Sequence, residues 1–478
     1  MYRKLVVVLS ILFLAGCSRS SQSVLEDAAQ AMGATNLQTI QYSGSGSNFA
    51  LGQNYTPDEP WPRFNVVSYT RTINYETASS REELLRTQFE DPPRGGGSQP
   101  VVGQQRQVFF VSGKDAWNQT GDQSTPAPAT AAERGLQVWL TPHGWVRAAL
   151  QNKVTAQQQT AAGKPATVIS FTLQGKYKVS GTINDQNLLE KVQTWLPNPV
   201  VGDMPVEIEY YDYKDFHGVK FPTRIVQKQG GHPTLELTVS DVQPHAPAAM
   251  ETPATVRGAA PAPVLVETQK LADGVWLIAG GSHNSVAVEF QDYVTVVEGP
   301  QNEARSLAVI AEVKQLVADK PIRYLVNTHH HFDHSGGIRT YAAEGVTIVT
   351  HEMNRAVYER SFQAPRTLEP DRMAQTGAAA KFETLTDQHV LTDGTRTLAI
   401  HHIRENSHNA GLLMAYLPRE RILIQADTWN ALPPATASHF TVNFLENINR
   451  LQLRVDRIVG MHGPVGTMAE LRRAVGGR

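Results

Sequence analysis

The residues that could do chemistry are concentrated after residue 263, where twelve of the sixteen histidines lie. His329, His331, Asp333 and His334 form an H-x-H-x-D-H pattern directly after a short apolar segment, residues 322–327. In an extended loop, residues two apart point the same way, so His329 and His331 can hold one ion while the other pair reaches a second. Imidazole and carboxylate suit borderline divalent ions. The pattern therefore predicts a two-metal site.

Further ligands for two ions are expected at the ends of other predicted strands. His408 follows one such strand, Asp427 ends another, and His462 comes after a third and precedes a glycine. These positions can face the same cleft if the strands share a sheet edge. His330 points away from its neighbours and is expected to pack or hydrogen-bond rather than to bind metal.

The order of these residues resembles that of the metallo-β-lactamase superfamily over residues 264–466. The resemblance implies an α/β fold, an αββα sandwich with a two-metal site at one edge. It also implies that Glu298, at the end of a predicted strand, supports a ligand histidine where many members have an Asp. The implied ligands are His329, His331 and His408 for the first ion, Asp333, His334 and His462 for the second, and Asp427 as the bridge.

The resemblance implies a hydrolase of small molecules. Two divalent ions, with zinc expected first and iron or manganese as alternatives, lower the pKa of a bridging water so that a hydroxide can attack. Asp333 would be catalytic, because it can orient that hydroxide and pass its proton on. The lack of a cysteine ligand, and Asp427 where one β-lactamase subclass has a serine, favour cleavage of an ester, thioester, lactone or related bond.

Two other classes of function stay open. Related folds bind a single iron through two His and one Asp and act as persulfide dioxygenases, and the chain could instead be a non-catalytic ligand-binding lipoprotein of the envelope. Substitution of Asp333 should abolish turnover if the protein is a hydrolase and leave ligand binding intact if it is a carrier. Measurements of iron content and oxygen uptake test the dioxygenase alternative. Only 53 residues separate His408 from His462, too few for an inserted nuclease domain.

The elements that must position these residues differ between the two parts of the chain. Residues 264–478 alternate predicted strands and helices, the pattern of an α/β domain. Residues 17–243 hold short β-branched and aromatic runs after one predicted helix at 24–32, which predicts a β-rich α+β domain. The Pro- and Ala-rich segment 244–263 lacks apolar periodicity and is expected to be a linker.

Several loops are expected to be exposed or to cover the cleft. Residues 91–100 (DPPRGGGSQP) and 121–132 read as exposed loops, and the three glycines of the first read as a turn because no GK[ST] follows them. Residues 429–440 are expected to lie over the cleft, with Trp429 as a candidate substrate wall. Residues 362–381 are a second candidate lid.

The amino terminus is expected to be an export signal. Residues 1–16 combine a short basic start with an apolar run too short to span a bilayer as a mature helix. The motif Leu-Ala-Gly-Cys at 14–17 resembles a bacterial lipobox. The resemblance implies that Cys17, the only cysteine, is acylated and anchors the mature chain to a membrane of the cell envelope, facing the periplasm. Ser18 favours the outer membrane.

Composition limits the range of partners. The 478 residues, 41% of them hydrophobic and 18% charged, allow two or three domains with buried cores. Lys and Arg number 43 against 45 Asp and Glu, which gives a net charge of −2 and no broad positive field for nucleic acid. We therefore expect a small-molecule substrate and no nucleic-acid partner. The sequence does not predict an oligomeric state.

Overall fold

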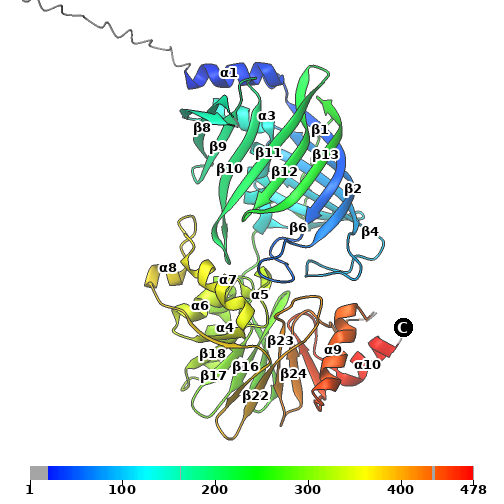
Figure 1. Ribbon diagram of the computed structural model, residues 1–478, viewed down its shortest axis with the longest axis vertical. Coiled ribbons are helices and arrows are strands. Elements are labelled where there is room, and N and C mark those ends of the chain that lie inside the picture. The colour runs from blue at the N-terminus through cyan, green and yellow to red at the C-terminus, as the bar shows by residue number, and fades with distance from the viewer. Residues whose placement is uncertain (1–19, 162, 433–436, 477–478) are drawn as a thin grey trace, which may run out of the picture.

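The computed structural model describes residues 20–161, 163–432 and 437–476, which form two domains (Figure 1). The predicted export signal and Cys17 lie outside the described residues. None of the helices in the described part of the chain combines the length and apolar character that crossing a membrane requires.

The N-terminal domain is built on one long, curved antiparallel sheet. Its described strands are β1 (Thr39–Phe49), β2 (Arg63–Asn74), β3 (Ser79–Gln88), β4 (Gln104–Ser112), β5 (Asp115–Thr120), β6 (Gln123–Pro126), β7 (Thr155–Ala161), β8 (Lys164–Leu173), β9 (Tyr177–Ile183), β10 (Leu189–Asn198), β11 (Gly202–Phe216), β12 (Val219–Gln229) and β13 (His232–Pro244). The strand order is β6-β5-β4-β3-β2-β1-β13-β12-β11-β10-β9-β8-β7, so the first and last strands of the domain pair in the middle of the sheet.

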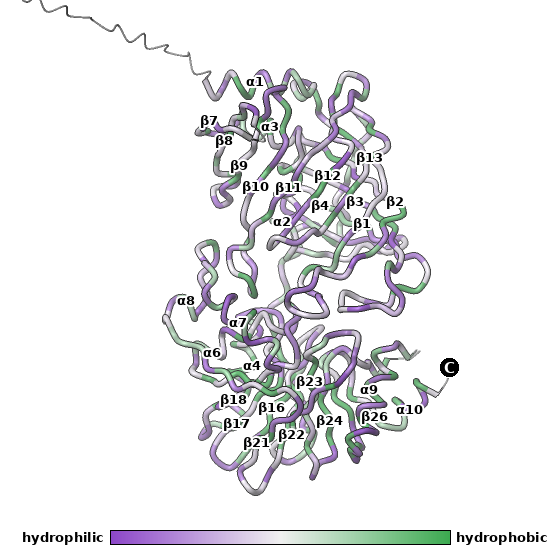
Figure 2. Tube along the Cα trace, in the orientation of Figure 1, coloured by the Kyte–Doolittle hydropathy of each residue, from purple (hydrophilic) through white to green (hydrophobic). Residues whose placement is uncertain are grey.

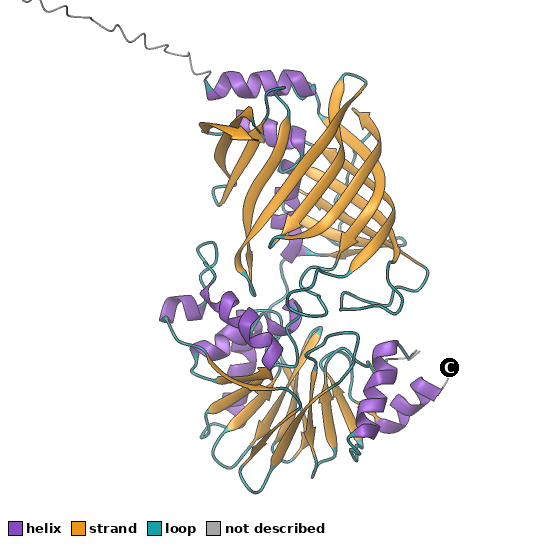
Figure 3. Cartoon of the chain, in the orientation of Figure 1, coloured by secondary structure: helices purple, strands orange, loops and turns teal. Residues whose placement is uncertain are grey.

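Helices cover one face of this sheet and close its core (Figure 3). They are α1 (Ser21–Met32), the 3₁₀ turn η1 (Pro128–Thr130), α2 (Ala131–Trp139) and α3 (Pro142–Leu150). Trp145 of α3 and Phe221 of β12 are among the fully buried side chains of the core. The β-rich α+β character predicted for this domain is observed.

Some elements of the N-terminal domain differ from the sequence expectation. Residues 121–132 are not one exposed loop, because they contain β6, η1 and the start of α2. Helices α2 and α3 were not predicted, since each has nine residues and only about two turns of periodicity. Strand β3 (SSREELLRTQ) carries charged, helix-favouring residues and is a strand because it pairs with β2 and β4 on both sides.

The C-terminal domain contains two sheets in the described residues. The first has the order β14 (Glu267–Ala272), β15 (Val275–Gly280), β16 (His283–Glu289), β17 (Val294–Val297), β18 (Ile322–Val326), β19 (Thr347–His351) and β20 (Lys381–Leu385). The second has the order β21 (Gln388–Thr392), β22 (Thr397–His402), β23 (Leu413–Leu417), β24 (Ile422–Gln425), β25 (Arg457–Gly460) and β26 (Gly466–Thr467). Residues 245–266, which join the two domains, carry no helix or strand.

Three apolar cores show that this domain has four layers. One core lies between the two sheets and draws on Val286 of the first and Leu413 of the second. A second lies between the first sheet and helices α4 (Glu303–Leu316), α6 (Ile338–Ala343), α7 (Glu352–Gln363) and α8 (Arg372–Thr376). A third lies between the second sheet and helices α9 (His439–Arg450) and α10 (Met468–Gly476). Figure 2 shows the hydrophobic segments along the central strands. The predicted αββα sandwich is confirmed.

Parallel pairing gathers the strand ends that carry polar residues. Strands β17, β18 and β19 are parallel in the first sheet, and β24 and β25 are parallel in the second. Their carboxyl ends therefore lie at one edge of the sandwich, where the loops after them can meet. This edge faces the N-terminal domain (Figure 1).

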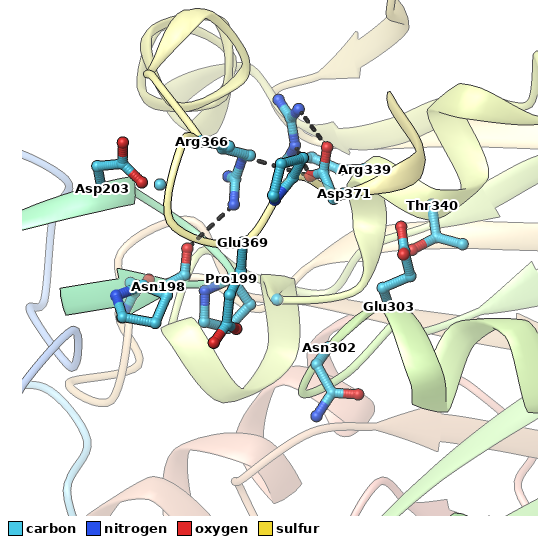
Figure 4. Close-up of a pocket in the computed structure, with 14 residues that line it drawn as sticks. Asn198, Pro199, Asp203, Asn302, Glu303, Arg339, Thr340, Arg366, Glu369 and Asp371 are labelled. Carbon is cyan, nitrogen blue, oxygen red and sulfur yellow. Dashed lines mark hydrogen bonds and ion pairs between the residues drawn. The ribbon is translucent and has the colours of Figure 1, made fainter. Parts of the chain in front are cut away.

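A hairpin of the N-terminal domain docks on the C-terminal domain beside this edge. Asp203, at the start of β11, accepts hydrogen bonds from the main chain of Thr367 and Leu368 at 2.9 and 3.1 Å. Arg366 donates to the carbonyls of Asn198 and Val200 at 3.0 and 2.8 Å and lines the cavity of about 330 Å³ in Figure 4. Part of the segment 362–381, expected as a lid, is thus a contact between the domains.

Candidate metal centre

The HHHFDH loop starts where β18 ends and becomes the short helix α5 (Phe332–Ser335) after His331. His331 keeps an extended backbone, with φ −54° and ψ 145°, and its carbonyl accepts a hydrogen bond from Ser335 Oγ at 2.9 Å. The change from extended chain to helical turn separates His329 and His331 from Asp333 and His334. The three histidines are fully buried, and the Asp333 side chain is 36% exposed.

The first donor group comprises His329, His331, His408 and Asp427, whose ligand atoms all lie within 4.8 Å of one another. Asp427 Oδ2 lies 3.0 Å from His408 Nε2 and 3.5 Å from His329 Nε2. Among the described residues, the buried His331 Nδ1 has no hydrogen-bond partner. An unpaired buried nitrogen is costly, and a cation in this group would supply its partner.

The second donor group comprises His283, Asp333, His334 and His462. Asp427 reaches this group as well, because its Oδ1 lies 3.0 Å from His462 Nε2 and its Oδ2 lies 3.1 Å from His334 Nε2. His462 Nε2 and His334 Nε2 are only 3.3 Å apart, a convergence of ring nitrogens that suits ligands of a shared cation. Asp427 therefore lies between the two groups, where a bridging carboxylate is expected.

Hydrogen bonds on the far side of the rings turn the free nitrogens toward the site. His462 Nδ1 donates to the Ser282 carbonyl at 2.8 Å, and His334 Nδ1 donates to Glu298 Oε2 at 3.1 Å. Such bonds fix the tautomer and the orientation of ligand histidines in metal sites. The donor set therefore fits borderline divalent ions.

Glu298 supports both donor groups from behind. It follows β17, is fully buried, and accepts a hydrogen bond from Thr328 Oγ1 at 2.5 Å in addition to that from His334. Thr328 Oγ1 in turn accepts from His329 Nδ1 at 3.0 Å. One carboxylate thus orients a donor of each group, in agreement with the supporting role expected for it.

Two of these carboxylates have a left-handed backbone. Glu298 has φ +77° and Asp427 has φ +61°, a region that costs energy for residues with a Cβ. Each residue directs the chain away from a strand end toward the donor groups. Such conformations persist where surrounding structure over-determines them, and they cluster at functional sites.

The ionisable groups of the site shift one another's pKa values. Burial would raise the pKa of Asp427, but the charges of His334 and His408 hold it well below its usual range. Burial, together with the neighbouring imidazoles of His334 and His408, lowers the pKa of His329 to about 3, so that this ring is neutral. Burial would lower the pKa of His334, but the carboxylates of Asp427 and Asp333 raise it well above its usual range. Because imidazole binds metal in its neutral form, a cation would have to displace the proton of His334.

Other candidate residues have packing or interface contacts. His330 is buried with Nδ1 3.2 Å from Asn354 Oδ1 and lies in none of the donor groups of the described residues. Trp429 is 5% exposed and packs in the core under α9 and α10, so the substrate wall expected there is wrong. Asn430 and Phe440 instead line a second cavity, of about 500 Å³, which Asp333, His408, Asp427 and His462 also line.

His283 is a donor that the sequence did not predict. It begins β16, its Nε2 lies 3.3 Å from Asp333 Oδ2, and its ring centroid lies 4.2 Å from that of His462. The sequence offers no signal, because His283 lies 46 residues before the motif and stands in no fixed spacing to it. Only the strand order places it beside Asp333.

A family comparison agrees with this architecture. Residues 278–435 match the family model described as the metallo-beta-lactamase superfamily. The C-terminal domain belongs to the metallo-β-lactamase superfamily. The match includes all the donors named above except His462, which lies beyond its end.

Structures of other superfamily members align with less than half of this chain. A metallo-β-lactamase from Pontibacter korlensis is 17% identical, with a TM-score of 0.36, and covers 44% of this chain and 97% of its own. The metallo-β-lactamase FIM-1 from Pseudomonas aeruginosa, in its mono-zinc form, is 20% identical, with a TM-score of 0.34, and covers 45% of this chain and 96% of its own.

A curated protein is also similar over part of its length. The alpha subunit of 2,4-dinitroanisole O-demethylase from Nocardioides sp. (strain JS1661) is 25% identical over 166 residues, which are 34% of this chain. The chain spans about 45% of the length of that subunit.

Proposed function

We propose that this chain is a binuclear metal-dependent hydrolase of small molecules. The observation that carries the proposal is Asp427, whose two oxygens lie 3.0 Å from His408 Nε2 in one donor group and 3.0 Å from His462 Nε2 in the other. Membership of residues 278–435 in a superfamily of generally metal-dependent hydrolases supports it.

Two divalent ions, zinc first among them, would supply an activated water nucleophile and a Lewis acid for the scissile group. Asp427 would bind to both ions, because its carboxylate reaches both donor groups. His329, His331 and His408 would hold one ion, and Asp333, His334 and His462 would hold the other, with His283 beside them.

Asp333 is the residue placed to handle a proton. Burial would raise its pKa, but the charge of His334 and the hydrogen bond from His283 hold it well below its usual range. The carboxylate is therefore ionised, so that it can orient a water molecule and accept a proton at Oδ2. Its side chain is partly exposed and lines a cavity of about 500 Å³, which gives a substrate access.

The proposal is tested on protein lacking residues 1–17 by elemental analysis and a panel of thioester, lactone, phosphodiester and β-lactam substrates. 2,4-Dinitroanisole joins the panel because of the O-demethylase subunit described above. We expect about two zinc ions per chain, hydrolysis of at least one substrate, and a loss of about 100-fold or more in kcat for Asp333→Asn. One iron per chain with oxygen uptake and no hydrolysis would favour the dioxygenase alternative, and no metal would refute the proposal.

We further propose that the chain acts as a lipid-anchored protein of the bacterial envelope, facing the periplasm and attached to the outer membrane. The support is the lipobox-like sequence that ends at Cys17. Metabolic labelling with a fatty-acid analogue should mark the wild-type chain and not Cys17→Ser. Equal labelling of the two would contradict the anchor.

A further inference from the structure

Two loops of the N-terminal domain lie directly on the metal centre. These roof loops are residues 50–56, between β1 and β2, and residues 93–99, between β3 and β4. Main-chain hydrogen bonds join them to the C-terminal loops that carry metal donors. The bonds run from Phe332 N to Gly52 O at 3.2 Å, from Ala410 N to Tyr55 O at 2.9 Å and from Gly95 N to Ser407 O at 2.8 Å.

Glycine permits this close approach at two positions. A Cβ on Gly52, whose φ is +70°, would lie 2.2 Å from the Phe332 ring. A Cβ on Gly96 would lie 2.0 Å from Gln53 Oε1 and 3.0 Å from His331 Nδ1. Main chain therefore packs against the donor groups, and Gly95 and Gly96, in the loop expected to be exposed, are buried at this contact.

The roof loops also orient donor side chains. Asn54 O accepts a hydrogen bond from His331 Nε2 at 3.0 Å, which leaves Nδ1 as the free nitrogen of that ring. Gln53 Nε2 donates to Asp333 Oδ1 at 2.7 Å, while Gln53 Oε1 accepts from Gly97 N at 3.0 Å. Both ends of the Gln53 amide are thus held, and its N–H is directed at the carboxylate that handles the proton.

Both domains line the cavity over the donor groups, which has a volume of about 500 Å³. Among the described residues that line it there is no Lys or Arg, and the uncharged polar groups are amides and a hydroxyl. An anionic group outside the metal centre would find no cationic side chain there. The described lining residues are Ala50, Leu51, Gln53, Gly96, Gly97, Ser98 and Gln99 from the roof loops and Asp333, His408, Asp427, Asn430, Phe440 and His462 from the C-terminal domain.

We infer that the two domains form one active site, in which the roof loops bind an uncharged ester-type substrate and Gln53 is a positioning residue for Asp333. The inference deepens the hydrolase function proposed above and rests on it. Without Gln53, the Asp333 carboxylate loses the 2.7 Å hydrogen bond at Oδ1 and, among the described residues, keeps only the 3.3 Å hydrogen bond from His283 at Oδ2.

The first experiment measures zinc affinity and needs no substrate. Gln53→Leu is compared with wild type and with Gln38→Leu, because Gln38 Nε2 also donates to a carboxylate, Glu76 Oε1, at 2.8 Å, but lies far from the donor groups. In chelator competition we expect Gln53→Leu to weaken one of two zinc ions by about 10- to 100-fold and Gln38→Leu to weaken neither. Unchanged affinity for both ions in Gln53→Leu would overturn the positioning role. Gln53→Asn, one methylene shorter, replaces Gln53→Leu if that variant does not fold.

The second experiment tests the substrate class with two esters that share a leaving group, 4-nitrophenyl butyrate and 4-nitrophenyl hemisuccinate. We expect kcat/KM to be at least about tenfold higher for the uncharged ester, and Gln53→Leu to lower kcat more than it raises KM. Equal or higher kcat/KM for the anionic ester would overturn the uncharged class. If neither ester is hydrolysed, the ester-type substrate is refuted, and the zinc titration still decides the role of Gln53.

Discussion

His143 in the N-terminal domain and the histidines of the metal centre are buried alike but have different surroundings. His143 stacks on Phe221 with an interplanar angle of 3° and donates from Nε2 to the Met32 carbonyl at 3.1 Å. Burial lowers its pKa to about 4, and burial lowers that of His329 to about 3. A low pKa therefore does not distinguish a metal ligand from a core residue. The difference is that, in the described part of the chain, several ring nitrogens converge on a carboxylate only at the metal centre.

The largest effect is expected from changing Asp427, the carboxylate on which the ring nitrogens of both donor groups converge. In Asp427→Asn, one ligand oxygen of the bridge becomes an amide nitrogen that cannot bind a cation, so both donor groups lose a shared charge. We expect fewer than two zinc ions per chain by mass spectrometry and a fall in kcat of about 1000-fold. Circular dichroism checks that the variant is folded. Two tightly held ions and normal turnover would show that Asp427 is not the bridge.

A second prediction concerns His143, whose protonation should affect the stability of the protein and not its metal binding. Since His143 has a pKa of about 4 in the folded protein and near 6.5 when unfolded, the unfolded chain binds the proton preferentially between these values. The free energy of unfolding should fall as pH is lowered from about 6.5 to about 4, by on the order of 3 kcal/mol.

Urea titrations measure this effect on protein from which a chelator has removed the metal. Metal-free protein is used because metal binding has a pH dependence of its own. His143→Gln keeps a hydrogen-bond donor for Met32 and should lack this part of the pH dependence while binding zinc as wild type does. A pH dependence identical to that of wild type would contradict the account of His143.

The smallest effect is expected from changing Glu298, which binds no ion itself but accepts hydrogen bonds that orient the ligands. Glu298→Gln places an N–H where the carboxylate accepts from Thr328 and His334, and we expect zinc affinity to fall by about 10- to 100-fold. Glu344→Gln, which breaks only ion pairs with Lys314 and Arg372, is the matched control and should leave affinity unchanged. Equal affinities of wild type and Glu298→Gln would show that these hydrogen bonds do not orient the ligands.

Local spacing explains what could be predicted from the sequence. The HHHFDH motif lies within six residues, so metal binding could be predicted from it without knowledge of the fold. The other predicted donors, His408, Asp427 and His462, follow apolar segments that are typical of buried strands. The alternating strand and helix patterns predicted an α/β domain, and the resemblance to the metallo-β-lactamase superfamily implied its αββα layering. Short or polar elements such as α2, α3 and β1 gave no comparable periodicity, because their structure depends on neighbours distant in the chain.

The residues that were missed act across large sequence separations. His283 reaches Asp333 through the pairing of β16 with β17, and Gln53 reaches it from 280 residues away through the docking of two domains. Neither carries a local pattern, since a histidine at a strand start and a glutamine in a loop are ordinary. For the same reason, DPPRGGGSQP read as an exposed turn although its glycines meet the metal centre.

The 280-residue separation between Gln53 and Asp333 also has a consequence for the order of folding. Contacts of such long range form late, because the chain between them must first be ordered. The N-terminal domain is synthesised first and domains generally fold as units, so its roof loops precede the HHHFDH loop that docks beneath them. A chain in which the two domains have not yet docked lacks the hydrogen bond from Gln53 to Asp333, so the proposed site is completed only when they dock.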